Sequence, residues 1–230
     1  MNRWGNYRAN SVRSRDFTIE EIEEIICSGS LEEIRELSRC YYRTNSLYRM
    51  NIDVLAGMPL YYTMVTPIFE SGKGSQAQIT KAFYNACNFV EKLDIKNTLF
   101  RVTKEWLKTG VYFGILQEKD GKVVLVDLPL THCRTRFKDF NNLNVLEFDI
   151  TYFNYKYSDQ VEREMAVLTF PEIVQKAWRD YKAHKLADTW VMIPASSGGV
   201  TFCFTEDQTP LLIASIPQLL HLKDAVKREE

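Results

Sequence analysis

The feature that most constrains how this chain folds is a stripe of large apolar residues at helical spacing between residues 34 and 55. Its steps of three, four and seven place one apolar face along a long helix, with a break permitted between Thr44 and Ser46. Gly57 and Pro59 predict that the helix ends before residue 57. We expect this face to be buried in the core. The stripe consists of Ile34, Leu37, Tyr41, Tyr48, Ile52 and Leu55.

Helical and strand patterns alternate along the rest of the chain. Thr18 and Glu21 form a capping box that opens a helix over 18–28, and Ser30 with Glu33 repeats the signal. A strand is expected at 60–66 and a surface loop at 69–76. Two further helices are expected before residue 111, one marked by Ile79, Phe83, Cys87 and Val90 and the next by Leu99, Val102 and Trp106, which ends at Gly110. A charged helix is expected at 159–168. Pro171 opens another helix with Ile173, Ala177 and Tyr181, and Pro217 opens the last with Leu219, Leu222 and Val226.

Three β-hairpins are expected in the second half of the chain. Strand 111–117 is apolar on both faces, which predicts that both faces are covered. The dipeptide Asp120-Gly121 then predicts a tight turn into a second strand. Residues 190–204 predict another hairpin, closed by a loop of serine and glycine.

The middle hairpin has a register that satisfies both of its faces. A two-residue turn at Asn141-Asn142 places cations opposite carboxylates on one face and apolar residues opposite each other on the other face. Lys138 is left without a partner on the charged face. The expected ion pairs are Arg134 with Asp149 and Arg136 with Glu147, each worth about 0.2–1 kcal/mol.

These elements predict an α+β fold in which helices pack around antiparallel β-hairpins and the chain ends in a helix. Residues 1–17 carry four arginines and no acid before Asp16, which predicts a flexible basic tail. We expect residues 18–216 to form one mixed α/β domain. Residues 217–230 are expected to begin a stem-like helix, which looks truncated because it ends on a charged run without a cap.

Composition and motifs argue against an enzyme. The net charge of −1 does not indicate a strongly basic nucleic-acid binder. Adjacent His132 and Cys133 would point to opposite faces of a strand, and no metal-binding or phosphate-loop spacing occurs. We therefore expect no catalytic, cofactor or metal site. Five cysteines without a CxxC pair indicate reduced thiols in a cytoplasmic setting, and the longest apolar stretch is too short to cross a membrane.

A row of arginines is the candidate functional feature. Arg35, Arg39 and Arg43 follow each other at steps of four, a spacing that costs about 0.2–0.5 kcal/mol per pair unless acids balance it. Glu36 balances only part of the row. We infer an acidic partner, either carboxylates of a neighbouring subunit, such as the acidic helix at 18–28, or DNA phosphates. The alternative is a solvated face, and Lys138 is the other unpaired candidate.

Several segments follow the residue patterns of one known protein family. The run from residue 46 to residue 67 resembles the pattern SxxYRR…YxAxMxxYxYxVTP, with Met50 where the family has a second arginine. The segments TGVYFGIL and LPLTHCRTRF resemble NGxYYGYL and LPxxYCRxRF, with His132 where tyrosine is usual. The similarity continues in order to about residue 225, and the ordered set resembles the portal proteins of tailed phages of Gram-positive hosts. The matching residues are Ser46, Tyr48, Arg49, Ala56, Met58, Tyr61, Tyr62, Val65, Thr66, Pro67, Leu128, Pro129, Cys133, Arg134, Arg136 and Phe137.

The resemblance implies a non-enzymatic structural protein of the virion. Such proteins form a dodecameric ring at one capsid vertex and are assembled in the host cytoplasm. They bind the terminase large subunit, the capsid and head–tail connector proteins, and they pass double-stranded DNA through a tunnel without sequence specificity. This chain would supply the wing and the start of a stem helix.

The family's proteins are longer than this chain, so the sequence leaves several forms open: a fragment, a split gene, a prophage remnant, or a subunit completed by a partner. Two other function classes also remain open. One is a nucleic-acid-binding or adaptor module that uses Arg35, Arg39, Arg43 and the basic tail. The other is a nuclease built from dispersed carboxylates.

Overall fold

The computed structural model describes residues 17–28, 30–61, 64–66, 75–119, 122–140 and 142–229. These residues form a mixed helix-and-sheet fold with two small antiparallel sheets, which confirms the α+β class. The basic tail up to residue 16 and the turn at Asp120-Gly121 lie outside the described residues. The helices are α1 (Ile19–Ser28), α2 (Leu31–Thr44), α3 (Ser46–Tyr61), α4 (Gln76–Lys92), α5 (Ile95–Thr109), α6 (Tyr152–Lys156), α7 (Gln160–Leu168), α8 (Glu172–Lys182) and α9 (Ile216–Glu229). The strands are β1 (Val111–Lys119), β2 (Lys122–Asp127), β3 (Cys133–Arg134), β4 (Leu146–Asp149), β5 (Trp190–Ile193) and β6 (Gly199–Cys203).

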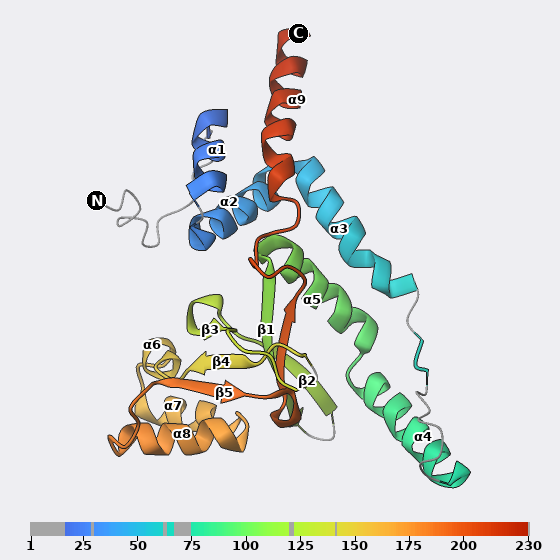
Figure 1. The fold of residues 1–230 in the computed structure, drawn as a ribbon, viewed down its shortest axis with the longest axis vertical. Helices are drawn as coiled ribbons and strands as arrows, with labels where there is room; N and C mark the ends of the chain where they lie inside the picture. The colour runs from blue at the N-terminus through green and yellow to red at the C-terminus, as the bar shows by residue number, and fades with distance from the viewer. Residues whose placement is uncertain are drawn as a thin grey trace.

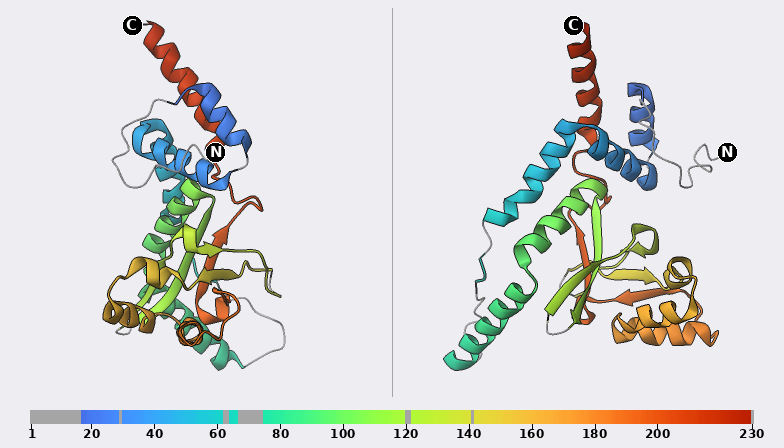
Figure 2. Two further views of the ribbon diagram at one scale, coloured as in Figure 1. Left: turned by 90° about the vertical axis from the view of Figure 1, so that its left-hand side faces the viewer. Right: turned by 180° about the vertical axis from the view of Figure 1, so that it is seen from behind.

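The molecule has a helical part and a sheet-containing part, joined by α5 and β1 (Figure 1). Helices α1, α2, α3 and the start of α9 gather at one end. The sheets β2-β1-β6 and β3-β4-β5 lie at the other end, with α6, α7 and α8 beside the second sheet. Helices α4 and α9 extend away from the body in all three views (Figures 1 and 2).

Strand β1 is the central element of the sheet part. Residues 111–115 are all buried, as expected of a strand covered on both faces. Phe113 belongs to the larger apolar cluster, with Phe148 and Trp178, whereas Tyr112 packs with Val102 of α5 on the opposite face. The prediction of cover on both sides is confirmed.

The helical stripe is confirmed, together with its break. Residues Ile34, Leu37 and Tyr41 of α2 and Tyr48 and Ile52 of α3 are buried in one cluster, and Leu55 is partly buried against it. The backbone at Asn45 is extended, with φ −111° and ψ 116°. Its side-chain oxygen then accepts a hydrogen bond from the Tyr48 amide at 2.9 Å, so this residue ends one helix and caps the next.

The predicted end of this helix is wrong. Helix α3 continues through Gly57 and Pro59 to Tyr61, and residues 64–66 form no strand. Proline lacks a backbone N–H and removes one intrahelical hydrogen bond. Pro59 lies in the last turn of α3, so the lost bond does not interrupt a longer helix. Residues 62–63 and 67–74, which contain most of the predicted loop, lie outside the described residues.

The first capping box is confirmed and the second is wrong. Thr18 Oγ1 accepts from the Glu21 amide, and Glu21 Oε2 accepts from the Thr18 amide, both at 3.2 Å. The Ser30 side chain makes no such bond. Its amide instead donates to Ser28 Oγ at 3.3 Å, so the group that Glu33 was expected to reach is already satisfied.

The third hairpin is also wrong, because its two strands join different sheets. Strand β5 pairs with β4, and β6 pairs with β1. Between them, Gly198 has φ +85° and Gly199 lies against Ile193, where an added Cβ would stand 2.2 Å from the Ile193 carbonyl oxygen. The chain therefore turns sharply and carries β6 from one sheet to the edge of the other.

The middle hairpin keeps its predicted faces but shifts its register. Arg134 pairs with Glu147 instead of Asp149, a slip of two residues, and Lys138 pairs with Asn144 instead of Val145. The two offsets differ by one residue, so the strand leading to the turn contains a bulge. A slip of two preserves the side-chain alternation, and the predicted pattern therefore could not distinguish the two registers.

Two smaller expectations about helix faces are also corrected. On α8, Val174, Ala177 and Trp178 are buried, whereas Ile173 is exposed. On α9 the helix begins at Ile216, which is fully buried in the helical cluster, while Leu222 is exposed.

Substitution of two glycines tests the fold with opposite expected signs. Gly110 has φ +78°, and a Cβ there would stand 2.0 Å from the Gln208 carbonyl oxygen, so Gly110→Ala should lower the free energy of unfolding by about 2 kcal/mol or more. Gly57 lies within α3 with nothing within 4 Å of an added Cβ, so Gly57→Ala should raise it by about 0.5–1 kcal/mol. Urea unfolding measures both. Equal destabilisation by the two variants would contradict this account.

Candidate assembly interface

The face of α3 that points into the protein is anchored by tyrosines. Tyr48 is fully buried, its hydroxyl lies 2.9 Å from Ser38 Oγ, and its ring meets Tyr41 edge-on at 6.3 Å between centroids. Both tyrosines therefore belong to the core, as the stripe predicted. They fix the rotation of α3 about its own axis.

A polar cluster holds α3 against its neighbours. Asp53 of α3 accepts a hydrogen bond from the Tyr42 hydroxyl at 2.9 Å and forms an ion pair with Lys104 of α5 at 2.8 Å. Burial acts to raise the pKa of Asp53, but the hydrogen bonds from Lys104 and Tyr42 outweigh it and hold that pKa below its ordinary value. Lys108 of α5 also lies 4.9 Å from the centre of the Tyr42 ring. These contacts join α2, α3 and α5.

The opposite face of α3 carries a second apolar stripe, which the described residues leave uncovered. Its members follow at steps of three, four and four, so they form one line along the helix. Their exposed fractions are 42% for Leu47, 54% for Met50, 59% for Val54 and 57% for Met58. We call these four residues the outer stripe. The outer stripe was not predicted from the sequence, although its helical spacing can be recognised there.

The arginine row does not act as one surface. Arg35 turns inward and donates from Nε to the Thr109 carbonyl oxygen at 2.8 Å and from Nη2 to that of Gln208 at 3.3 Å. Arg39 pairs with Glu36 at 2.6 Å. Arg43 is exposed and has no ion pair within the described part of the chain. Arg35 therefore stabilises the junction of α2 with the end of α5, and the inferred need for an external acid applies to Arg43.

A further exposed cation, which forms no ion pair within 4 Å among the described residues, lies beside the outer stripe. Arg49 is exposed on α3, and it lines a shallow hollow together with Met50 and Val54 of the outer stripe. The hollow also includes Asp53 and Gly57. The α2–α3 corner thus combines exposed apolar side chains with the two exposed cations Arg43 and Arg49.

The hairpin cations serve a structural role. Arg134 Nε and Arg136 Nε lie 2.5 and 2.9 Å from Glu147 Oε2, and Glu147 is 2% exposed. The pair of Arg136 with Glu147 is confirmed, whereas that of Arg134 with Asp149 is wrong, because Asp149 accepts from the Thr151 amide and hydroxyl. Arg134 also stacks on Trp190, with 3.7 Å between the guanidinium carbon and the ring centre. Lys138 is exposed.

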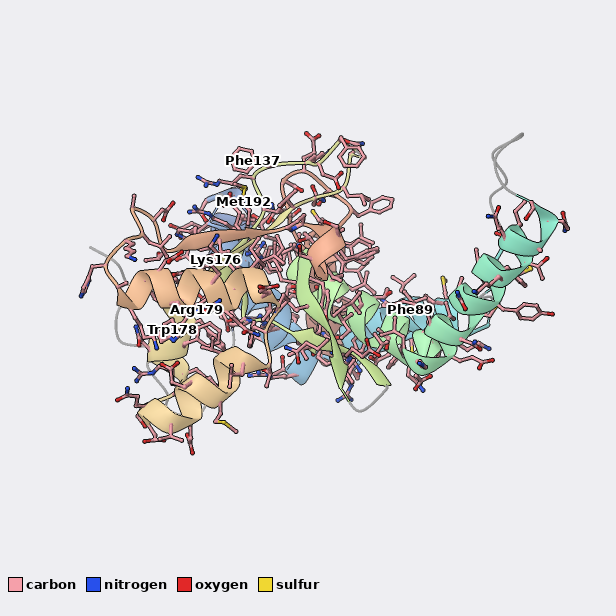
Figure 3. All side chains as sticks on the ribbon, turned by 90° about the horizontal axis from the view of Figure 1, so that it is seen from below. Phe89, Phe137, Lys176, Trp178, Arg179 and Met192 are labelled. Carbon is pink, nitrogen blue, oxygen red and sulfur yellow. The ribbon has the colours of Figure 1, made fainter. Side chains whose placement is uncertain are left out.

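Other exposed apolar groups occur on the sheet part and on α4. On α7, Val161, Met165 and Leu168 form a stripe that is 63–70% exposed. Phe137 and Met192 are exposed beside the second sheet, and Phe89 is exposed on α4, far from them (Figure 3). Single exposed apolar residues are ordinary, but lines of them at helical spacing are typical of surfaces that bind other chains.

The described residues offer little for catalysis. No three of their histidine, cysteine, aspartate and glutamate side chains are arranged to hold a metal ion. Burial raises the pKa of the Cys133 thiol well above its ordinary value, and His132 packs against Tyr152 and Tyr155. None of the described helices combines the length and apolar character needed to span a bilayer.

Comparison with known proteins gives no relative: neither a protein-family model, nor a curated protein, nor a solved structure matches this chain.

The cluster around Glu147 predicts how stability depends on pH. Burial acts to raise the pKa of Glu147, but hydrogen bonds from Arg136 and Arg134 outweigh it and place that pKa below the ordinary value of 4.5. A lowered carboxyl pKa contributes stability that is fully present above pH about 4.5 and is lost as the pH falls through the folded-state value. Glu147→Gln should therefore destabilise the protein by about 2 kcal/mol at pH 7 and flatten the decline below pH about 4.5.

Denaturant unfolding at several pH values measures this effect. Glu162→Gln, which removes an exposed carboxylate on α7, is the matched control and should change stability by less than about 0.5 kcal/mol. An unchanged acid profile in Glu147→Gln would show that the cluster does not contribute in this way.

Proposed function

We propose that this chain is a structural subunit of a phage portal, the ring at the capsid vertex through which DNA is packaged and ejected. In this proposal the mixed helix-and-sheet body is the wing and α9 begins the stem. The protein is not an enzyme. Its partners are copies of itself, the terminase large subunit, capsid and head–tail connector proteins, and double-stranded DNA passing through the tunnel.

The observation that carries the proposal is the outer stripe of α3. Four large apolar side chains at helical spacing are costly to expose: each is 42–59% exposed, so burying the remainder of each is worth about 1 kcal/mol. They lie on a helix whose other face is fully packed, so the stripe is not a gap in the core. A protein that works by assembling with other chains accounts for such a surface, and the ordered resemblance to portal proteins points to the kind of assembly.

The charge distribution supports the same assignment. A tunnel that passes DNA must not grip it, because each phosphate contact adds affinity. The chain has a net charge of −1, and Arg35 is committed to backbone carbonyl groups inside the protein. These features favour the portal subunit over the alternative, a nucleic-acid-binding module that uses Arg35, Arg39 and Arg43.

Electron microscopy and sedimentation of the purified chain test the proposal. We expect closed rings with a central hole, formed by the chain alone or with the product of the adjacent reading frame. DNA binding that weakens steeply with salt, by a chain that stays monomeric in both samples, would contradict the portal assignment and support the binding module.

A further inference from the structure

Within the residues that the structure describes, two surfaces of opposite charge lack ion-pair partners. The outward face of α1 presents Glu20, Glu23 and Glu24, all exposed and without ion pairs in the described part of the chain. Their steps of three and four place like charges together, which costs about 0.2–0.5 kcal/mol per pair. The α2–α3 corner presents Arg43 and Arg49. A cationic partner would remove the repulsion among the glutamates of α1, and an acidic partner would pair the two arginines of the α2–α3 corner.

The hollow on α3 has free space at Gly57. Glycine within a helix costs about 0.5–1 kcal/mol relative to alanine, yet none of the described residues approaches Gly57, since an added Cβ would have none of their atoms within 4 Å. The residue therefore leaves space on the outside of the helix. That space adjoins Arg49, Met50 and Val54.

Other charges near the hollow are already balanced. Asp53 lines it but is paired with Lys104 and hydrogen-bonded by Tyr42. Arg39, on the same helix as Arg43, is paired with Glu36. The net demand of this surface is for a partner that brings carboxylates together with some apolar contact. Helix α1 offers both, because half-buried Ile26 borders its acidic face.

The two surfaces cannot meet within one molecule and should not pair with themselves. Helices α1 and α3 lie on opposite sides of the helical part (Figures 1 and 2). A symmetric contact of α3 with α3 would oppose arginines to arginines, and one of α1 with α1 would oppose glutamates to glutamates. Opposite charges meet only when α1 of one copy faces α3 of another, which is a head-to-tail contact that can close into a ring.

We propose that α1 of one copy docks on the α3 hollow of the next copy, with Glu20, Glu23 and Glu24 facing Arg43 and Arg49 and with the outer stripe buried beside them. This inference rests on the proposed function, because it names the surfaces through which the subunits meet. The partner is a second copy of this chain, and DNA or an unrelated acidic protein is an outcome of the test.

A charge exchange between the two surfaces tests the docking. Arg43→Glu/Arg49→Glu makes both surfaces acidic, and Glu20→Lys/Glu24→Lys makes both basic. Each variant alone should associate about tenfold or more weakly than wild type, because like charges then face each other. An equimolar mixture should recover association, since each variant supplies the charge that the other needs.

Two further variants control for charge and for shape. Lys176→Glu/Arg179→Glu makes the same change of net charge on α8, away from both surfaces, and should leave association unchanged (Figure 3). Gly57→Trp fills the hollow from a position open to the outside, so it should abolish association while circular dichroism and the unfolding midpoint stay close to wild type.

Sedimentation velocity of the full chain separates the outcomes. Recovery in the mixture supports the docking. Rings of wild type that survive both charge variants and Gly57→Trp would overturn this contact while leaving the proposed function standing. A wild-type chain that stays monomeric at the highest soluble concentration would overturn the docking, and the absence of rings with the product of the adjacent reading frame as well would overturn the proposed function. Loss of DNA binding, with no effect on self-association, in Arg43→Glu/Arg49→Glu would assign the surface to phosphate.

Discussion

The burial of one continuous face of α2 and α3 is the constraint on which the rest of this structure depends. Tyr48, Ile52 and Ala56 are fully buried, and the contacts of Tyr48 with Ser38 and Tyr41 fix the rotation of α3. Once that face is fixed, geometry decides what α3 presents to the outside. The outer stripe, the Gly57 space and Arg49 are therefore held in a defined arrangement before any partner binds, which lowers the entropic cost of association.

The arginines that hold the fold together are paired, and two groups of charges without ion pairs in the described part of the chain lie on opposite sides of the helical part. Arg35 donates to a backbone carbonyl group and stabilises the helical part. Arg134 and Arg136 bind buried Glu147 and stabilise the middle hairpin of the sheet part. The cations and acids without partners in the described part of the chain include Arg43 and Arg49 on one side and the α1 glutamates on the other. Under the proposed docking, a chain that is nearly neutral overall would attract copies of itself in one orientation.

Some local patterns in the sequence predicted local structure correctly, whereas the helix end expected at Gly57 and the capping box expected at Ser30 are wrong. The α2–α3 stripe, the break at Asn45 and the helix end at Gly110 follow from residues that are neighbours in the chain, and each is confirmed. The partner of β6 could not be found in this way, because a short apolar strand fits the edge of either sheet equally well by pattern. The register of the middle hairpin failed for a related reason, since a slip of two residues at Arg134 leaves that side chain on its predicted face, and the bulge that follows it could not be found from the pattern.

Only part of the candidate interface could be predicted from the sequence. The sequence identified Arg43 as an exposed cation. The spacing of the arginine row could not show that Arg35 lies against the backbone carbonyl groups of Thr109, at the end of α5, and Gln208, in the loop before α9. The outer stripe does have a helical period. It was missed because the stronger inner stripe on the same helix already accounted for that segment.

Oxidation of methionines by dilute peroxide tests most directly whether the outer face of α3 is buried between copies. Met50 and Met192 have nearly equal exposed fractions in the single chain, 54% and 55%, but only Met50 lies in the outer stripe. In assembled protein, peptide mass spectrometry should show Met50 protected while Met192 oxidises at the rate seen in the monomeric charge variants. Equal oxidation of Met50 and Met192 in the assembled protein would contradict the account.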